Sequence, residues 1–400
     1  MASELGLLIG ALLVFLYALV GRRLSSTILT APMIFLFAGW ALHKAGLVAP
    51  SEHGHGLHIL AEVSLIVLLF ADAAMIEPKR LLRDAAKPAR MLVLGLPLMI
   101  ALGFVAGWLL LPDWPLWEIA LIAAILAPTD AALGQAVVTN PKIPEKIRQT
   151  LSAESGLNDG LALPFVVFFG SFAVGGLEGQ PESWGVFVAQ QIGMGALAGL
   201  LTGVIGGLML RGAEALKLSS DSFGGVAVLA LAGLSYLVSG ELGGNGFLAA
   251  FIGGLAFGAV MRGRNAFVFE FIETEGQLLT VLSFLVIGAV LMPQGLPEVS
   301  LGAAVLILLS LFVLRPLAIS LSLIGTGTPR FERLYLGWFG PRGLATALFA
   351  LLVLDEFQTL TMHEQVLNVA STAVLFSVVL HGITAAPSAR LFKSSGKDQS

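Results

Sequence analysis

Two short stretches of the chain place acids and small oxygen-bearing side chains inside otherwise apolar sequence. The first reads APTD and ends with Thr129 and Asp130, and the second reads ESGLND, from Glu154 to Asp159. Carboxylate, hydroxyl and amide oxygens are the hard ligands that suit small, hard cations in proteins. We therefore infer that these two stretches could form an oxygen-lined site for a small monovalent cation.

The spacing within the second stretch aligns its polar side chains on a helix. Glu154 and Asn158 are four residues apart, as are Ser155 and Asp159, so each pair stacks on one helical face. The alternative is that Ser155 and Asn158 only hold neighbouring helices together, as such side chains often do in membranes. That explanation fits Asp159 poorly, because an isolated acid in an apolar segment needs a stronger reason to be there.

The elements that carry these residues are predicted to be membrane-spanning helices. Of the 400 residues, 56% are hydrophobic and only 12% are charged, and the mean hydropathy is +0.90. The apolar residues gather in blocks of about 20, the length that crosses the hydrocarbon core as a helix. We expect an all-α polytopic membrane protein. The chain contains no cysteine, which excludes disulfides and thiolate metal sites.

The distribution of positive charge predicts how the helices are oriented. Of the 22 lysines and arginines, all except Lys44, Arg315 and Arg342 follow odd-numbered spans. Because cytoplasmic loops collect positive charge, the N-terminus is predicted outside and the C-terminus in the cytoplasm. A signal peptide is the alternative for the first span, although its basic residues follow the apolar run. The thirteen predicted spans are 4–20, 27–48, 57–76, 91–111, 117–138, 148–173, 184–210, 222–239, 244–261, 277–294, 299–324, 332–354 and 364–386.

Charged side chains inside these spans are functional candidates, because each is costly in lipid unless it is paired or faces water. They are Asp72, Asp130, Glu154, Asp159, Arg315 and Arg342. At about 1.5 Å per residue, all of them except Asp72 lie roughly 9–17 Å from the cytoplasmic face. Asp72 is shallower, near the cytoplasmic mouth. An ion pair of Arg315 with Glu154 would leave Asp159 to titrate, whereas the alternative is that Arg315 extends to the interface.

Two spans contain a helix-breaking sequence next to a charge, APTD at 127–130 and GPRG at 340–343. Proline removes a backbone donor, and broken helices occur in membranes where they line a cavity or are buried in protein. One break carries the acid Asp130 and the other carries the base Arg342, and these opposite charges could neutralise the positive N-terminal and negative C-terminal ends of half-helices. The breaks are seven spans apart and run in opposite directions, which predicts inverted repeats with two crossed discontinuous helices. An ordinary proline kink is the alternative.

The inverted repeats divide the chain. The expected divisions are repeat one at about 4–173, a connector helix at 184–210, repeat two at about 222–386 and a short cytoplasmic tail at 387–400.

Together these motifs resemble the monovalent cation:proton antiporters, specifically the NhaP-type sodium/proton exchangers. The resemblance covers nearly the whole chain and rests on PTD, ESGLND, GPRG and the pair Arg315-Pro316. It implies a secondary transporter rather than an enzyme, with no cofactor and no nucleic acid partner. It further implies a homodimer in a bacterial or archaeal plasma (inner) membrane, with a dimerisation domain separate from a moving core. Asn-Asp rather than Asp-Asp in the second motif is typical of the electroneutral branch.

The resemblance also implies the residues of the transport site. Asp159 would bind the cation and the proton in turn, and Asp130 would accompany it. Ser155 and Thr129 would complete the ligands of Na⁺ or Li⁺, and Thr129 would offer its main-chain carbonyl and also its hydroxyl.

Further residues would support that site. Asn158 would order the broken-helix region, Glu154 and Arg315 would form a buried ion pair, and Arg342 would balance the second crossover. Asp72 stands where relatives more often carry glutamate at the cytoplasmic entrance. The predicted tail is too short for the cytoplasmic regulatory domain of many relatives.

The chemistry expected of this arrangement is exchange. An acid in the hydrocarbon region escapes the cost of its charge by taking up a proton or by binding a cation. Proton and cation would therefore compete for Asp159, and one exchangeable charge suits one-for-one exchange by alternating access. The alternatives are a potassium/proton antiporter and a sodium-coupled solute symporter, which should have more aromatic or hydrogen-bonding groups at the crossover. A remote alternative is an intramembrane protease using Asp130 and Asp159, although no peptide-binding strand is evident.

Overall fold

The computed structural model describes residues 2–24, 27–48, 55–76, 85–174, 184–262, 266–295 and 298–392. Within these ranges the regular structure is entirely helical, without a strand, as the composition predicts. Eight helical segments of the described chain are long and apolar enough to cross a membrane, and several shorter apolar helices accompany them.

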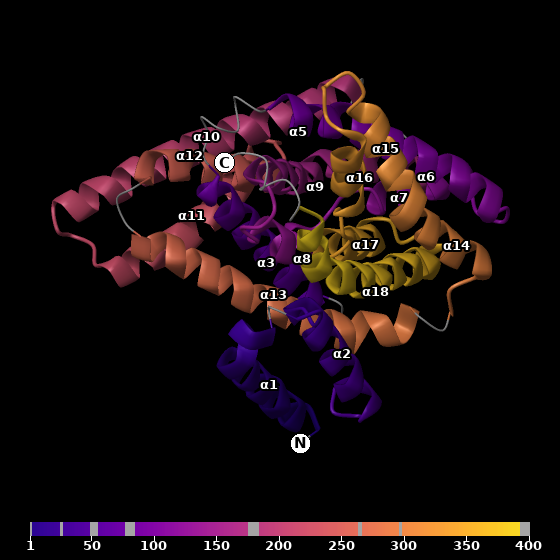
Figure 1. Ribbon diagram of the computed structural model, residues 1–400, viewed down its shortest axis with the longest axis horizontal. Helices are drawn as coiled ribbons and strands as arrows, with labels where there is room; N and C mark the ends of the chain where they lie inside the picture. Colours follow the sequence, from indigo (N-terminus) through magenta and orange to yellow (C-terminus); the bar gives the residue numbers. More distant parts are fainter. Residues whose placement is uncertain are drawn as a thin grey trace.

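The helices group into thirteen consecutive segments in the described chain, which match the thirteen predicted spans (Figure 1). In order, they are α1 (Ala2–Leu24); α2 (Ala31–Lys44); α3 (His55–Met75); α5 (Ala86–Arg90), η1 (Met91–Gly95) and α6 (Leu96–Leu110); α7 (Leu116–Ile125) and α8 (Ala131–Val138); α9 (Glu145–Ala173); α10 (Trp184–Ala215); α11 (Asp221–Glu241); α12 (Gly246–Met261); α13 (Ala266–Gly295); α14 (Leu301–Leu309), η3 (Ser310–Leu314) and α15 (Arg315–Ser322); α16 (Arg330–Trp338) and α17 (Leu344–Glu356); and α18 (His363–Ser388), followed by η4 (Ala389–Phe392).

Some helix ends differ from the predicted spans for local reasons. α2 begins at Ala31 rather than residue 27, because the Thr30 hydroxyl accepts a hydrogen bond from the Met33 amide and Pro32 suits the first turn. α13 begins at Ala266 rather than residue 277. Its first turns carry acidic residues, which a hydropathy pattern assigns to a loop although a helix can extend beyond the lipid.

The helices pack as two bundles. The core bundle consists of α5 to α9 and α14 to α18, and the scaffold bundle consists of α2, α3 and α10 to α13. In Figure 1, α10, α11 and α12 lie at the left, and α6, α14 and α15 lie at the right. The bundles meet where α9 packs on α12, α18 on α13 and α17 on α3. The broken helices α7/α8 and α16/α17 therefore belong to the same bundle.

The segments that precede the two broken helices repeat an unusual feature. η1 and η3 are π-helical turns, and each is followed by a proline in the next helix, Pro97 and Pro316. Because proline cannot donate to the preceding turn, the ladder of hydrogen bonds widens there. Segments four and eleven thus share a π-helical turn, and segments five and twelve share a helix break. This correspondence is what two structural repeats within the chain would produce.

The helix ends next to the basic loops meet on one face of the molecule. Arg262, after α12, donates to the Ile76 carbonyl after α3 at 2.6 Å. Arg90, before η1, donates to the Ser322 carbonyl at the end of α15 at 2.7 Å. We call this face the basic side. α9 begins there, and α12 ends there.

Candidate functional site

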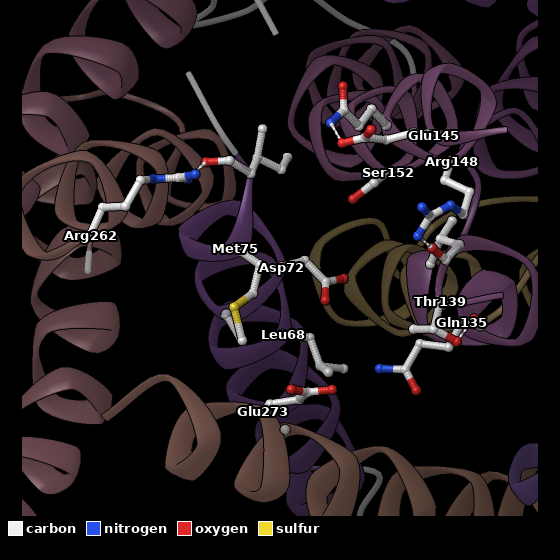
Figure 2. Close-up of a pocket in the computed structure, with 15 residues that line it drawn as sticks. Leu68, Asp72, Met75, Gln135, Thr139, Glu145, Arg148, Ser152, Arg262 and Glu273 are labelled. Carbon is white, nitrogen blue, oxygen red and sulfur yellow. Dashed lines mark hydrogen bonds between the residues drawn. The ribbon is translucent and has the colours of Figure 1, made fainter. Parts of the chain in front are cut away.

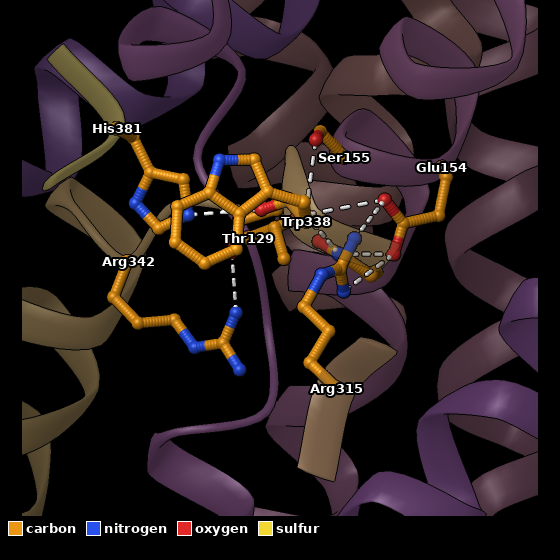
Figure 3. A network of polar contacts seen from close by, with 9 residues as sticks. Thr129, Glu154, Ser155, Arg315, Trp338, Arg342 and His381 are labelled. Carbon is orange, nitrogen blue, oxygen red and sulfur yellow. Dashed lines mark hydrogen bonds and ion pairs between the residues drawn. The ribbon is translucent and has the colours of Figure 1, made fainter. Parts of the chain in front are cut away.

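The loop between α7 and α8 contacts α9 through buried polar side chains (Figure 3). The Thr129 hydroxyl lies 2.9 Å from the Ser155 hydroxyl and accepts a hydrogen bond from the Asn158 amide at 2.6 Å. Thr129 also lies 3.3 Å from a carboxylate oxygen of Glu154. The first break is therefore fixed directly onto the polar face of α9.

Glu154 is held by Arg315, which begins α15. The two guanidinium nitrogens lie 3.1 Å and 3.0 Å from the two carboxylate oxygens, in the bidentate geometry of a strong pair. Both residues are buried. A Cβ atom at Gly340 would lie 1.7 Å from Arg315 Nε, so the first glycine of GPRG allows the second break to lie against this guanidinium. The ion pair thus joins α9, α15 and the second break.

Asp130 lies where the two broken helices cross. One of its carboxylate oxygens accepts a hydrogen bond from the Leu344 amide at 2.6 Å, and the other accepts one from the Leu133 amide at 3.3 Å. Its own amide donates to the Pro341 carbonyl at 2.8 Å. One negative charge therefore caps the positive N-terminal ends of both α8 and α17. A Cβ atom at Gly343 would lie 1.9 Å from this carboxylate, so the second glycine of GPRG provides space for it.

Arg342 lies at the opposite kind of helix end. Its guanidinium donates to the Gly340 carbonyl, just after α16, and lies 3.5 Å from the Ser310 hydroxyl. Its amide donates to the Ser377 hydroxyl at 2.6 Å. A cation beside the negative C-terminal end of α16 is favourable. Asp130 and Arg342 therefore carry the sign that suits the helix ends they contact.

His381 on α18 completes this second break and was missed by the sequence analysis. One ring nitrogen lies 2.9 Å from the Trp338 carbonyl at the end of α16, and the other lies 3.1 Å from the Ser377 hydroxyl (Figure 3). The nitrogen near Ser377 also lies 2.9 Å from the Ser377 carbonyl, so each ring nitrogen of His381 faces a backbone acceptor. A lone histidine in the apolar sequence VVLHGIT is the signal that could have pointed to it.

Asp159 differs from the buried acids Asp130 and Glu154 because one of its carboxylate oxygens lacks a hydrogen-bond partner among the described residues. It is only 2% exposed, and it lies close enough to Asp130 and Glu154 to interact with their charges. Among the described residues, one of its oxygens has no hydrogen-bond partner, and neither does the side-chain oxygen of Asn158. A buried acceptor without a partner is costly. Two such oxygens on adjacent residues of α9 suit a bound cation.

A cavity of about 510 Å³ opens between the two bundles on the basic side (Figure 2). Asp72 from α3 and Glu273 from α13 line it on the scaffold side, and Gln135 from α8 and Ser152 from α9 line it on the core side. Asp72 lies close enough to Asp130 to interact with its charge. The sequence analysis missed Glu273 because it placed this residue in a loop, although acids at 270, 273 and 275 mark the stretch.

Two further acids inside the predicted spans were also missed. The carboxylate of Glu118, on α7, accepts hydrogen bonds from the amides of Thr361 and Met362 at 2.8 Å each, just before α18. Glu62, on α3, accepts a hydrogen bond from the Tyr236 hydroxyl of α11. These bonds give both acids structural roles.

Comparison with known proteins identifies relatives along the whole chain. The family model described as sodium/hydrogen exchanger, transmembrane, matches residues 9–391. The K(+)/H(+) antiporter NhaP of Alkalimonas amylolytica is 29% identical over 413 residues, which cover 98% of this chain and 68% of that protein. The K(+)/H(+) antiporter NhaP2 of Shewanella oneidensis is 28% identical, with 96% and 67% covered. The Na(+)/H(+) antiporter 2 of Zygosaccharomyces rouxii is 28% identical, with 79% and 41% covered. The chain thus spans about two thirds of its bacterial relatives.

Solved structures show the same fold. The sodium proton antiporter MjNhaP1 of Methanocaldococcus jannaschii at pH 8 superposes with a TM-score of 0.76 at 21% identity, with 95% of this chain and 97% of that chain covered. A second structure of MjNhaP1 gives a TM-score of 0.78 at 22% identity, with 100% and 98% covered. These matches confirm the predicted all-helical membrane fold with inverted repeats and two crossed broken helices. Since the family model matches nearly the whole chain, this protein belongs to the sodium/hydrogen exchanger family, whose members are antiporters rather than enzymes.

Proposed function

We propose that this cation/proton antiporter exchanges Na⁺ or Li⁺ for protons, one for one, at Asp159. The observation that carries the proposal is the buried carboxylate of Asp159, whose unpaired oxygen lies on the same helix as the unpaired oxygen of Asn158. A cation would satisfy both oxygens, and a proton would instead neutralise the carboxylate. Binding of one ligand therefore excludes the other.

The neighbouring residues divide the remaining work. Ser155 and Thr129 provide oxygens on the adjoining faces, and they already contact each other at 2.9 Å. Asp130 adds negative charge to the site while its oxygens accept hydrogen bonds from α8 and α17. Asn158 ties the first break to α9. We assign these residues to the cation site as ligands or direct supports.

The pairing of the other charges supports electroneutral exchange. Glu154 is neutralised by Arg315, and Arg342 lies at a helix end that favours a cation. Asp159 is left as the carboxylate whose charge changes during the cycle. The core bundle then moves only when Asp159 carries a proton or a cation, because moving a bare buried charge is costly. The cavity lined by Asp72 supports access from the basic side in the present state.

A second candidate is exchange of K⁺ for protons. The observation that favours it is that two bacterial relatives, NhaP and NhaP2, are K(+)/H(+) antiporters. The same oxygens could bind the larger cation in a slightly wider site. Nothing in the relatives favours a solute symporter or a protease.

We place the basic side in the cytoplasm, in line with the distribution of lysine and arginine. The N-terminus is then outside, in a bacterial or archaeal plasma (inner) membrane, and the protein is a homodimer. Repeat one at 4–173, the connector helix at 184–210 and repeat two at 222–386 make up the transport domain, followed by the tail at 387–400, of which 393–400 lie outside the described residues. Cysteines introduced at Lys44 and Arg211 should react with membrane-impermeant reagents from opposite sides.

The experiment that tests the proposed function is exchange in proteoliposomes loaded with a pH-sensitive dye. A pH step should drive counterflow of Na⁺ or Li⁺ in the wild type and none in Asp159→Asn. The matched control is Glu241→Gln, which removes an exposed acid at the end of α11 and should exchange normally. Response to K⁺ alone would favour the second candidate, and wild-type exchange by Asp159→Asn would refute the role of Asp159.

A further inference from the structure

The helix that carries Asp159 is unusually close to the scaffold at the residue that follows it. A Cβ atom at Gly160 would lie 3.0 Å from the Leu248 side chain and 3.1 Å from its backbone. A Cβ atom at Gly156 would lie 2.1 Å from the Phe251 ring. Both glycines therefore bring α9 against the first turns of α12, across the boundary between the core and scaffold bundles.

The backbone of α9 has a defect at this contact. Pro164 lies inside the helix, four residues after Gly160. In an α-helix the carbonyl of residue i accepts from the amide of residue i+4, and proline has no such hydrogen. The Gly160 carbonyl therefore lacks its donor within the helix, and a buried acceptor in this state needs another partner.

Asn245 of the scaffold supplies the missing donor. Its side-chain nitrogen lies 2.9 Å from the Gly160 carbonyl, and its side-chain oxygen accepts a hydrogen bond from the Leu248 amide at 2.9 Å. The second bond fixes the orientation of the amide, because only the oxygen can accept and only the nitrogen can donate. Asn245 is 1% exposed, so neither bond competes with water.

Asn245 is itself firmly attached to the scaffold. Its backbone amide donates to the Gln191 carbonyl of α10 at 2.9 Å. A Cβ atom at Gly195 would lie 2.8 Å from its carbonyl oxygen, so α10 passes directly alongside. Its side chain caps α12. The side-chain nitrogen that donates to Gly160 therefore belongs to a residue whose backbone and side-chain oxygen are both held by hydrogen bonds within the scaffold.

We propose that Asn245 is a positioning residue for ion exchange, which docks α9 on the scaffold through the carbonyl that Pro164 leaves without a donor. The docked Gly160 peptide follows Asp159 directly, so the bond sets the place of the carboxylate relative to the scaffold while the cavity is open on the basic side. Movement of the core bundle away from this position breaks the bond. The inference rests on the proposed exchange at Asp159 and adds a residue of the opposite bundle to it.

The bond can be removed without removing the helix cap. Serine is a good N-cap residue but is too short to cap Leu248 and to reach Gly160 as well. In Asn245→Ser, the KM for the cation added on the basic side should rise about fivefold, the effect of one net hydrogen bond, while kcat changes little. The KM changes because the docked state is less populated, and a merely structural defect would lower the amount of active protein instead.

The proline provides the decisive control. In Pro164→Ala the new amide donates to Gly160 from within α9, so the docking bond loses its importance. The variant Asn245→Ser should therefore raise the KM about fivefold in the wild-type background and less than about twofold in the Pro164→Ala background. If Asn245→Ser does not fold, Pro164→Ala should restore its yield in the double variant.

The outcomes separate this inference from the proposed function. Absence of exchange in the wild type with every cation would refute the proposed function. Normal exchange together with an unchanged KM in Asn245→Ser would refute only the positioning role. An equal rise in KM in both backgrounds, or a double variant that still does not fold, would also overturn it, because Asn245 would then act independently of the Pro164 defect.

Discussion

At the scale of single residues, the buried acids differ in whether both of their carboxylate oxygens have hydrogen-bond partners. Glu154 has both oxygens on Arg315, and Glu118 has both oxygens on backbone amides. Asp130 accepts from two helix ends. Of these four acids, only Asp159 has a buried carboxylate oxygen without a hydrogen-bond partner among the described residues. The chemical identity of all four is similar, so their partners decide which of them can exchange a ligand.

The ion pair of Glu154 and Arg315 gives a prediction at this scale. Replacing either residue alone leaves its partner buried and unpaired, which should lower the free energy of unfolding by about 3–5 kcal/mol. The double replacement should cost less than the sum of the two single ones. Thermal unfolding in detergent measures both effects.

A surface pair provides the control for this prediction. Lys87 and Glu332 lie 3.7 Å apart, and their side chains are 26% and 30% exposed. Lys87→Ala should change stability by less than about 1 kcal/mol, because exposed pairs contribute little. Equal losses at the buried and the exposed pair would contradict the structural role of Glu154.

At the scale of elements, two half-helices point their N-terminal ends at one carboxylate. α8 and α17 come from opposite halves of the chain, and Asp130 caps both. The close approach depends on Gly343, because any side chain there would collide with the Asp130 oxygen. The crossing is therefore held together by a charge and by a glycine contributed by the other break.

Asp130→Asn should weaken this crossing. An amide offers one acceptor oxygen, so one of the two helix ends loses its cap and both lose the favourable charge. We expect a loss of about 1–3 kcal/mol in stability and a large fall in exchange. Gly343→Ala should behave in the same way, as measured by thermal unfolding and dye response.

Gly134 supplies the matched glycine control on α8. A Cβ atom there has nothing within 4 Å, so Gly134→Ala should keep wild-type stability and exchange. If Asp130→Asn is as stable as the wild type, the carboxylate does not hold the two helix ends.

The sequence predicts those features of the site that depend on residues close to one another in the chain. The spans follow from hydropathy, both breaks from proline beside a charge, and the polar face of α9 from four-residue spacing. It could not predict that Asp130 contacts Leu344, because these residues are 214 positions apart in the chain. It could not predict that Gly340 lies against Arg315 either, because that contact depends on how two helices cross. His381 was missed because a single polar residue shows its role only through its neighbours in space, and Glu273 was missed because hydropathy assigned the first turns of α13 to a loop.

At the scale of the whole molecule, the cavity on the basic side lies between the two bundles. Its lining contains three acids, Asp72 and Glu273 from the scaffold and Glu145 from the core bundle, and two arginines, Arg148 and Arg262. An excess of negative over positive side chains at a mouth raises the local concentration of cations. In the proposed mechanism, Asp72 and Glu273 of the scaffold would therefore attract cations to the site on the core bundle.

The mouth gives a prediction at this scale. Asp72→Asn with Glu273→Gln should raise the KM for the cation about two- to fivefold at low ionic strength, because electrostatic attraction is lost. The difference should shrink in high concentrations of a salt that is not transported, since salt screens it. Glu275→Gln, which does not line the cavity, is the control. A salt-independent effect would indicate direct binding instead.

Competition at Asp159 is the central claim, and the pH dependence of cation affinity tests it most directly. Initial exchange rates should be measured over a range of cation concentrations at several pH values on the side of the cation, with the opposite side held constant. If proton and cation bind the same carboxylate, the apparent KM should rise about tenfold per unit of falling pH in the acidic range, while kcat stays constant. A KM that does not change with pH while kcat falls would show that the two ions bind separate sites and would contradict the account.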